Sequence, residues 1–156
     1  MTDRPLGFDT LAIHAGTAPD PATGARQVPI YQTTAYVFRD ADHAAKLFNL
    51  QEVGYIYSRL TNPTVSALAN RVVALEGGAG GIACSSGHAA QIMALFPLMQ
   101  PGRNVVASTR LYGGTIQQFS NTIRKFGWSA KFVDFDAPKE IEKAIDADTR
   151  ALFCET

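Results

Sequence analysis

The segment Ile82–Gln91 has the sequence IACSSGHAAQ, in which an apolar run stops at two serines and a glycine and an alanine-rich helical pattern follows. We expect a strand over 81–85 and a helix over 87–99, with Ser86 as its N-cap. In open α/β sheets, ligands bind at the carboxyl ends of strands, beside helix N-termini. The turn therefore has two interpretations, a plain helix cap or a site where the first helical amides hold an anion. From this motif alone, the plain cap is favoured.

Downstream of this turn, strand-like and helix-like patterns alternate. The expected elements are strands at 104–108, 130–135 and 151–154 and helices at 115–126 and from Pro138 onward. Such alternation is typical of βαβ units, which build a mainly parallel sheet with helices on its faces. No helix follows the last expected strand, so we interpret the chain as the front part of a longer protein.

Upstream of the turn, Asn62 and Pro63 are typical of a helix start. Apolar residues then recur at helical spacing up to Gly77-Gly78, at Val65, Leu68, Val72 and Leu75. The residues before Asn62 are rich in glycine and proline and predict only a short helix within 40–51, capped by Asp40. We therefore expect residues 1–61 to form an extended arm that lies against another surface and residues 62–156 to form the first part of an α/β domain.

The composition limits the classes of partner. Fourteen Lys and Arg balance fourteen Asp and Glu, so no basic excess favours nucleic acid or an anionic membrane. No apolar run approaches the roughly 20 residues of a membrane span, and the N-terminus lacks a signal core. Cys84 and Cys154 lie in apolar runs and are expected to be buried, reduced thiols of a cytoplasmic protein. No histidine has metal-ligand spacing with either cysteine, so no metal site is expected.

Three further stretches have local interpretations. The glycines of GGAGG, 77–81, precede the expected strand, whereas a dinucleotide-binding fingerprint must follow one, so they predict a linker. In YIYSRLTNPT, 55–64, Arg59 alone is typical of a surface charge. In LYGGT, 111–115, Tyr112 follows a strand and should lie near the same sheet end as the serine-glycine turn, although a lone tyrosine is more often a packing residue.

Taken in order, AIHAG, VPIYQTTAYVF, YIYSRLTNPT, ALEGG, SSGHAAQ and LYGGT resemble the pyridoxal-phosphate enzymes of cysteine and methionine metabolism, most closely the O-acetylhomoserine sulfhydrylases. The resemblance extends from about Phe8 to the last residue. It implies the aspartate-aminotransferase-like fold (fold type I), a homotetramer that is a dimer of dimers, and pyridoxal 5'-phosphate as cofactor. The implied reaction is γ-replacement on O-acetylhomoserine by sulfide or a thiol, which gives homocysteine or methionine.

The resemblance also assigns site residues. Tyr57 and Arg59 match the pair that reaches across the dimer interface to the cofactor phosphate of the neighbouring subunit, which implies that the arm, residues 1–61, bridges two subunits. Gly87 and His88 match the residues whose backbone amides hold the phosphate within one subunit. Tyr112 matches the tyrosine that stacks on the pyridine ring and is the only acid/base candidate that the family pattern supports.

Other parts of the family's site have no match in this chain. The lysine that binds the cofactor covalently, the aspartate at the pyridine nitrogen and the arginine for the substrate carboxylate lie, in the family, beyond Thr156. We therefore expect the isolated chain to be inactive. Glu155 matches a position close to the cofactor.

The choice within the family depends on small features. Gly114 stands where methionine γ-lyases carry a cysteine, and the run from His88 to Ala90 is more like sulfhydrylases than cystathionine γ-synthases. Both relatives remain alternatives, as does a non-catalytic module that binds phosphate or assembles with another chain. A nucleotide-binding doubly wound domain is disfavoured because no strand-to-helix turn carries the glycine fingerprint.

Overall fold

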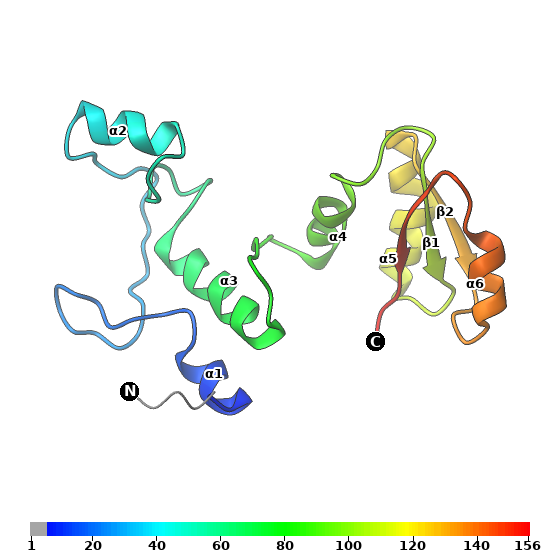
Figure 1. Ribbon diagram of the computed structural model, residues 1–156, viewed down its shortest axis with the longest axis horizontal. Helices are drawn as coiled ribbons and strands as arrows, with labels where there is room; N and C mark the ends of the chain where they lie inside the picture. Colours follow the sequence, from blue (N-terminus) through cyan, green and yellow to red (C-terminus); the bar gives the residue numbers. More distant parts are fainter. Residues whose placement is uncertain (1–5) are drawn as a thin grey trace. The chain divides into compact units, whose positions relative to one another are not determined.

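The computed structural model describes residues 6–156. The chain divides into two compact units, one up to Ala83 and one from Cys84 (Figure 1). The expected arm, 1–61, begins in residues outside the described part. Its division from an α/β domain at Asn62 stays a prediction.

The second unit is built on a three-stranded parallel sheet in the order β2-β1-β3. The strands are β1 (Asn104–Ser108), β2 (Ser129–Val133) and β3 (Thr149–Phe153). All five residues of β1 are buried, because β1 is central and pairs with a strand on each side. The parallel α/β architecture expected from the sequence is confirmed, with strand bounds shifted by two residues or fewer.

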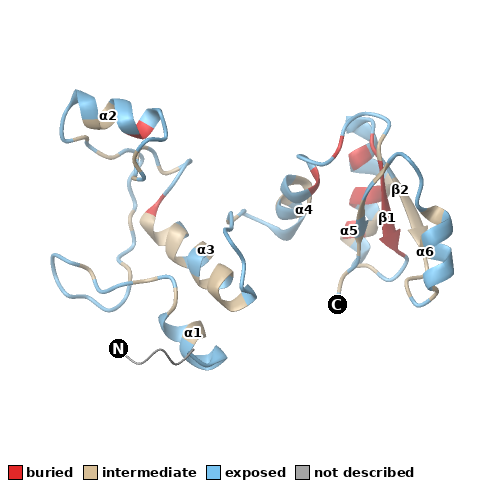
Figure 2. Ribbon diagram, viewed as in Figure 1, coloured by how far each residue is buried: buried red, intermediate tan, exposed pale blue. Residues whose placement is uncertain are grey.

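Helices cover this sheet. They are α4 (Gly87–Leu95), α5 (Gly113–Gln117) and α6 (Pro138–Ala144), with α5 continuing as a π-helical turn (Gln118–Thr122) and a 3₁₀ turn (Ile123–Phe126). The core comprises Leu95, Met99, Val105, Ala107, Phe119, Ile123 and Trp128. In Figure 2 the buried residues of this unit concentrate in β1 and in α5 with its continuation. The Phe119 and Phe153 rings meet edge to face with centroids 4.9 Å apart, which joins α5's continuation to β3.

Residues 81–85 do not form the expected strand. The segment pairs with none of the strands in residues 6–156, and the Ile82 side chain is 81% exposed. A strand requires a neighbour to accept and donate its backbone hydrogen bonds, and apolar composition alone supplies none. The prediction of buried thiols was also wrong: Cys84 lies in this unpaired segment and Cys154 directly follows the edge strand β3, and both are exposed.

The first unit contains α1 (Phe8–His14), α2 (Ala41–Phe48) and α3 (Pro63–Glu76). Two predicted caps are confirmed, since the Asp40 carboxylate accepts from the His43 N–H and the Asn62 side chain accepts from the Thr64 N–H. Gly77 ends α3 in the left-handed conformation, with φ of 63°. Within the described part of the chain, no helix is both long enough and apolar enough to cross a membrane.

The turn after α1 packs closely on α3. Gly16 has φ of +73°, and a Cβ there would lie 2.6 Å from the Arg71 backbone nitrogen. The Arg71 Nε donates to the Ala15 carbonyl at 3.0 Å and fixes the same turn from the other side. The glycine of AIHAG therefore serves the packing of α1 on α3, which the sequence pattern did not predict.

The opposite side of α3 is apolar and exposed. Val65, Leu68 and Val72 lie on the predicted stripe, and Leu68 is 60% exposed. The helical periodicity is confirmed, but the burial that such a stripe predicts is absent from the described residues of this unit. Periodicity identifies an apolar face and says nothing of what covers it.

Candidate functional site

The amino-terminus of α4 is capped as predicted. Ser86 is extended, with φ of −159° and ψ of 158°, and its Oγ accepts from the Ala89 N–H at 3.2 Å. The amides of Gly87 and His88 have no intrahelical carbonyl to bond and no other acceptor within residues 6–156. The cap therefore leaves free the two amides that an anion would need, and the two interpretations of this turn are compatible.

Space is also available at this terminus. A Cβ built on Gly87 would meet no atom within 4 Å. Packing within the described residues therefore does not require a glycine at this position, whereas close approach of a bound group to the backbone would favour one.

Tyr112 and His88 face each other beside the same terminus. Their rings are stacked, with centroids 6.0 Å apart and an interplanar angle of 29°, and Tyr112 is 70% exposed. Gly114 makes room for the pair, since a Cβ there would lie 2.5 Å from Tyr112 Cε1 and 2.7 Å from His88 Cε1. The structure thus brings Gly87, His88 and Tyr112 together at the end of the sheet where the expected site lies.

Glu155 lies behind this pair and accepts several hydrogen bonds. The Tyr112 N–H donates to its Oε2 at 2.6 Å, and the Thr115 hydroxyl donates to its Oε1 at 2.5 Å. The Gln91 side-chain amide donates to the same Oε1 at 3.2 Å. The bonds from Thr115 and Tyr112, together with the charge of His88, hold the pKa of the Glu155 carboxyl below its usual value. Glu155 is therefore an anionic acceptor.

Sequence reasoning missed the side chains that connect these elements. Gln91 also donates to Thr115 Oγ1 at 3.1 Å, and Gln118 donates from Nε2 to the His88 carbonyl at 3.1 Å. The Oε1 atoms of both glutamines are buried without a partner in the described residues. A signal for Gln91 was available, because it lies four residues after Gly87 and thus on the same face of α4.

Tyr57 and Arg59 lie in the first unit. Tyr57 forms an isolated antiparallel bridge with Ala35, and the Arg59 Cζ lies 5.3 Å from the centroid of the Tyr57 ring. Arg59 is exposed and forms no ion pair with a carboxylate of residues 6–156. The pair is held together by a cation–π contact, and its guanidinium is available to an anion.

A polar clamp, formed by Tyr31, Tyr36, Ser58, Asn62 and Thr64, supports the backbone on either side of this pair. Asn62 is 7% exposed, and its Nδ2 lies 2.9 Å from the Tyr31 carbonyl, 3.0 Å from Ser58 Oγ and 3.2 Å from the Tyr36 hydroxyl. Thr64 Oγ1 accepts from the Tyr31 N–H at 3.0 Å. The polar residues of SRLTNPT thus fix the segment that presents Tyr57 and Arg59.

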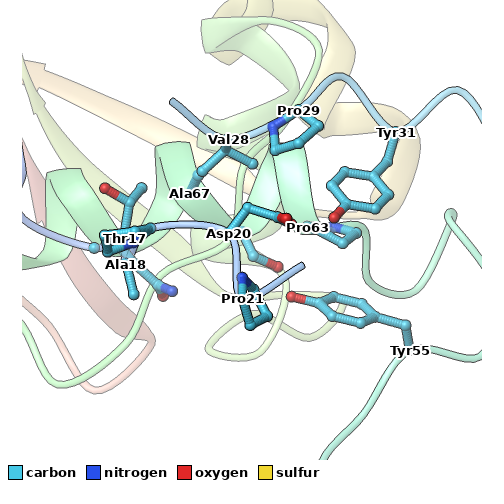
Figure 3. Close-up of a pocket in the computed structure, with 14 residues that line it drawn as sticks. Thr17, Ala18, Asp20, Pro21, Val28, Pro29, Tyr31, Tyr55, Pro63 and Ala67 are labelled. Carbon is cyan, nitrogen blue, oxygen red and sulfur yellow. The ribbon is translucent and has the colours of Figure 1, made fainter. Parts of the chain in front are cut away.

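The first unit also has a cavity of about 300 Å³. It is bounded by residues 16–21, Tyr31, Tyr55 and the start of α3, and Figure 3 shows the Tyr55 hydroxyl directed towards Pro21 and the Tyr31 hydroxyl towards Pro63. Neither Tyr57 nor Arg59 lines it. The cavity is therefore separate from the predicted site residues of this unit.

Comparison with known proteins identifies a family that matches the chain. Residues 9–156 match the family profile described as Cys/Met metabolism PLP-dependent enzyme. The homocysteine synthase of Schizosaccharomyces pombe is 50% identical over 149 residues, which cover 96% of this chain and 35% of that protein. The O-acetyl-L-homoserine sulfhydrylase of Leptospira meyeri is 49% identical over 148 residues, 95% of this chain and 34% of that protein.

Among solved structures, the chain resembles a putative O-acetylhomoserine (thiol)-lyase from Campylobacter jejuni, which contains N'-pyridoxyl-lysine-5'-monophosphate. The TM-score is 0.91 at 45% identity, over 96% of this chain and 37% of that one. The chain spans about a third of the length of the relatives it matches.

Proposed function

Because the chain belongs to the PLP-dependent enzymes of cysteine and methionine metabolism, we propose that it supplies the amino-terminal half-site of an O-acetylhomoserine sulfhydrylase. The reaction replaces the acetate at the γ-carbon of O-acetylhomoserine by sulfide or a thiol and gives homocysteine or methionine. The identity of 49% to the Leptospira meyeri sulfhydrylase carries the proposal. The proposed assembly is a cytoplasmic homotetramer, a dimer of dimers.

The amino-terminus of α4 suits the phosphate of pyridoxal 5'-phosphate. The free amides of Gly87 and His88 and the positive end of the helix dipole both favour a dianion. The open space over Gly87 admits the phosphate oxygens to the backbone. Ser86 contributes by holding the first turn of α4 in place through its bond to the Ala89 N–H.

Arg59 and Tyr57 are the proposed contribution to the neighbouring subunit's phosphate. A guanidinium offers two parallel N–H groups to a phosphate and keeps its charge at any physiological pH. Arg59 is exposed and stacked on Tyr57, so part of its rotamer freedom is already lost before an anion binds. The polar clamp around Asn62 keeps this segment in place.

Tyr112 is the proposed partner of the pyridine ring. Its exposed aromatic face suits an offset stack, and its Oη is the atom that can hold or pass on a proton at the substrate. When bound, the cofactor supplies the electron sink for the carbon chemistry. The chain's own residues bind the phosphate, orient the ring and hold one proton, and no lysine here matches the family's cofactor-binding motif.

The test uses the natural protein that carries residues 1–156. Given O-acetylhomoserine, sulfide and pyridoxal phosphate, it should release acetate and homocysteine in equal amounts. The isolated chain should produce neither above the cofactor-only background. Cystathionine formed from cysteine in preference to homocysteine from sulfide would redirect the proposal to a cystathionine γ-synthase. A protein that binds no pyridoxal phosphate would overturn it.

A further inference from the structure

Glu155 collects hydrogen bonds from three different parts of the second unit. The Tyr112 N–H belongs to the loop after β1, the Thr115 hydroxyl to α5 and the Gln91 amide to α4. Glu155 itself follows β3, the strand that pairs beside β1. A single carboxylate therefore joins the loop and the two helices at the carboxyl ends of the parallel strands.

The bond to the Tyr112 N–H sets the position of the tyrosine backbone. The residue precedes α5 with φ of −52° and ψ of 136°, and it has no side-chain cap bond of its own. With its amide held at 2.6 Å from Glu155, the exposed ring lies over His88, the second residue of α4. Gln91 lies on the same helix as His88 and donates to the same carboxylate. The elements that carry the two stacked rings are therefore both hydrogen-bonded to Glu155.

We propose that Glu155 is a positioning residue of the site, whose carboxylate fixes the Tyr112 loop against α4 so that the Tyr112 ring and the first amides of α4 form one prearranged surface. The consequence for catalysis depends on the proposed function, because it assumes that this surface receives the cofactor. The positioning itself depends only on the hydrogen bonds of the second unit.

The donor set explains why this residue is a carboxylate. A backbone N–H and the Nε2 of Gln91 can only donate, and they approach different oxygens of Glu155. A glutamine side chain of the same shape has one oxygen, so its NH₂ would face one of these donors. The Gln91 Nε2 donates to both Glu155 Oε1 and Thr115 Oγ1, whereas the Gln91 Oε1 is buried without a partner among the described residues. The orientation of the Gln91 amide therefore serves donation to these two oxygens.

The first experiment compares Glu155→Gln with Glu142→Gln, a change at an exposed residue of α6. Hydrogen–deuterium exchange is measured on the natural protein freed of cofactor. We expect exchange in peptides covering 109–117 to rise about tenfold or more in Glu155→Gln, since a lost charged hydrogen bond of a loop is worth at least that factor. Peptides covering β1 should not change, and Glu142→Gln should match the parent throughout.

A pair of substitutions at Thr115 tests the same network without touching the carboxylate. Thr115→Val removes the hydroxyl that bonds Glu155 Oε1, and Thr115→Ser keeps it. Exchange at 109–117 should rise several-fold in the valine variant and return towards the parent in the serine variant. Because the two residues share one network, Thr115→Val should add little to the effect of Glu155→Gln when both are combined.

Reconstitution with pyridoxal phosphate separates positioning from function. In Glu155→Gln we expect a weaker near-visible circular dichroism band, because a loosened aromatic ring orients the cofactor less well. We also expect kcat to fall by a larger factor than KM changes. Parent-like exchange at 109–117 in Glu155→Gln and Thr115→Val would overturn the positioning role. Increased exchange with an unchanged circular dichroism band would support the anchoring of the loop by Glu155 and contradict the role of Tyr112 at the cofactor.

Discussion

The two units of the chain carry their site residues in different ways. In the second unit, Tyr112 and His88 stack on each other, and hydrogen bonds behind them reach Glu155. In the first unit, a polar clamp holds only the backbone, and the Arg59 side chain is left exposed over Tyr57. The side chains proposed to act within their own unit are prearranged by that unit, whereas a side chain proposed to serve a neighbouring subunit needs only a fixed backbone and an exposed charge.

The largest effect is expected from disrupting the polar clamp of the first unit. Asn62→Ala removes the cap of α3 and leaves the half-buried Tyr31 carbonyl without its donor. A lost cap costs about 1 kcal/mol and each lost hydrogen bond of the Asn62 Nδ2 about a further 0.5–1.5 kcal/mol, so the free energy of unfolding should fall by about 2–4 kcal/mol. Urea denaturation measures this loss. Asn49→Ala, at an exposed position beside α2, is the control. Equal losses of stability in the two variants would contradict a stabilising role of the polar clamp.

The second prediction leaves the polar clamp intact and removes the charge of Arg59. Arg59→Ala should raise the dissociation constant for pyridoxal phosphate about tenfold to a hundredfold in the natural protein, because a charge-assisted contact to the phosphate is lost. Arg59→Lys should fall between, since it keeps the charge and loses the planar fork. Stability should hardly change, because Arg59 forms no ion pair within the described residues. Arg39→Ala, at another exposed arginine, should bind cofactor as the parent does.

Features set by residues close together in the chain could be predicted from the sequence, whereas features set by distant residues could not. The bounds of β1 and the caps at Asn62 and Ser86 were predicted because they depend on residues within a few positions of one another. The strand at 81–85 was not found, because a strand depends on neighbours that no local pattern specifies. Family resemblance pointed to Tyr112 and His88, but the link through Gln91 arises only when α4 packs beside α5.

A smaller effect is expected at the cap of α4. Ser86→Ala removes the acceptor of the Ala89 N–H and should cost about 1 kcal/mol of stability, whereas Ser86→Thr keeps an oxygen and should cost a few tenths. The frayed first turn would also hold the amides of Gly87 and His88 less firmly. Thermal unfolding and cofactor titration of the two variants measure both effects. Weaker cofactor binding in the threonine variant than in the alanine variant would contradict a capping role.

The smallest effect on stability, and the sharpest test of prearrangement in the second unit, concerns two adjacent glycines. A Cβ on Gly114 would overlap the Tyr112 and His88 rings, whereas a Cβ on Gly113 would meet no atom within 4 Å. Neither glycine has a positive φ, so alanine is compatible with both backbones. Since the overlapping atoms are ring tips that can move, Gly114→Ala should displace the rings while changing the free energy of unfolding by no more than about 1 kcal/mol.

Crystal structures of Gly114→Ala and Gly113→Ala would measure the separation of the two ring centroids, which is 6.0 Å in the parent. We expect that separation to increase only in Gly114→Ala, with a weaker near-visible circular dichroism band after cofactor is added. A stack that survives the added methyl group would mean that the space at Gly114 does not position Tyr112. In that case the hydrogen bond from the Tyr112 N–H to Glu155 alone would account for the position of Tyr112. The Tyr112 side chain would then be placed by a backbone hydrogen bond of its own unit, whereas the Arg59 side chain stays exposed on a backbone that the polar clamp fixes.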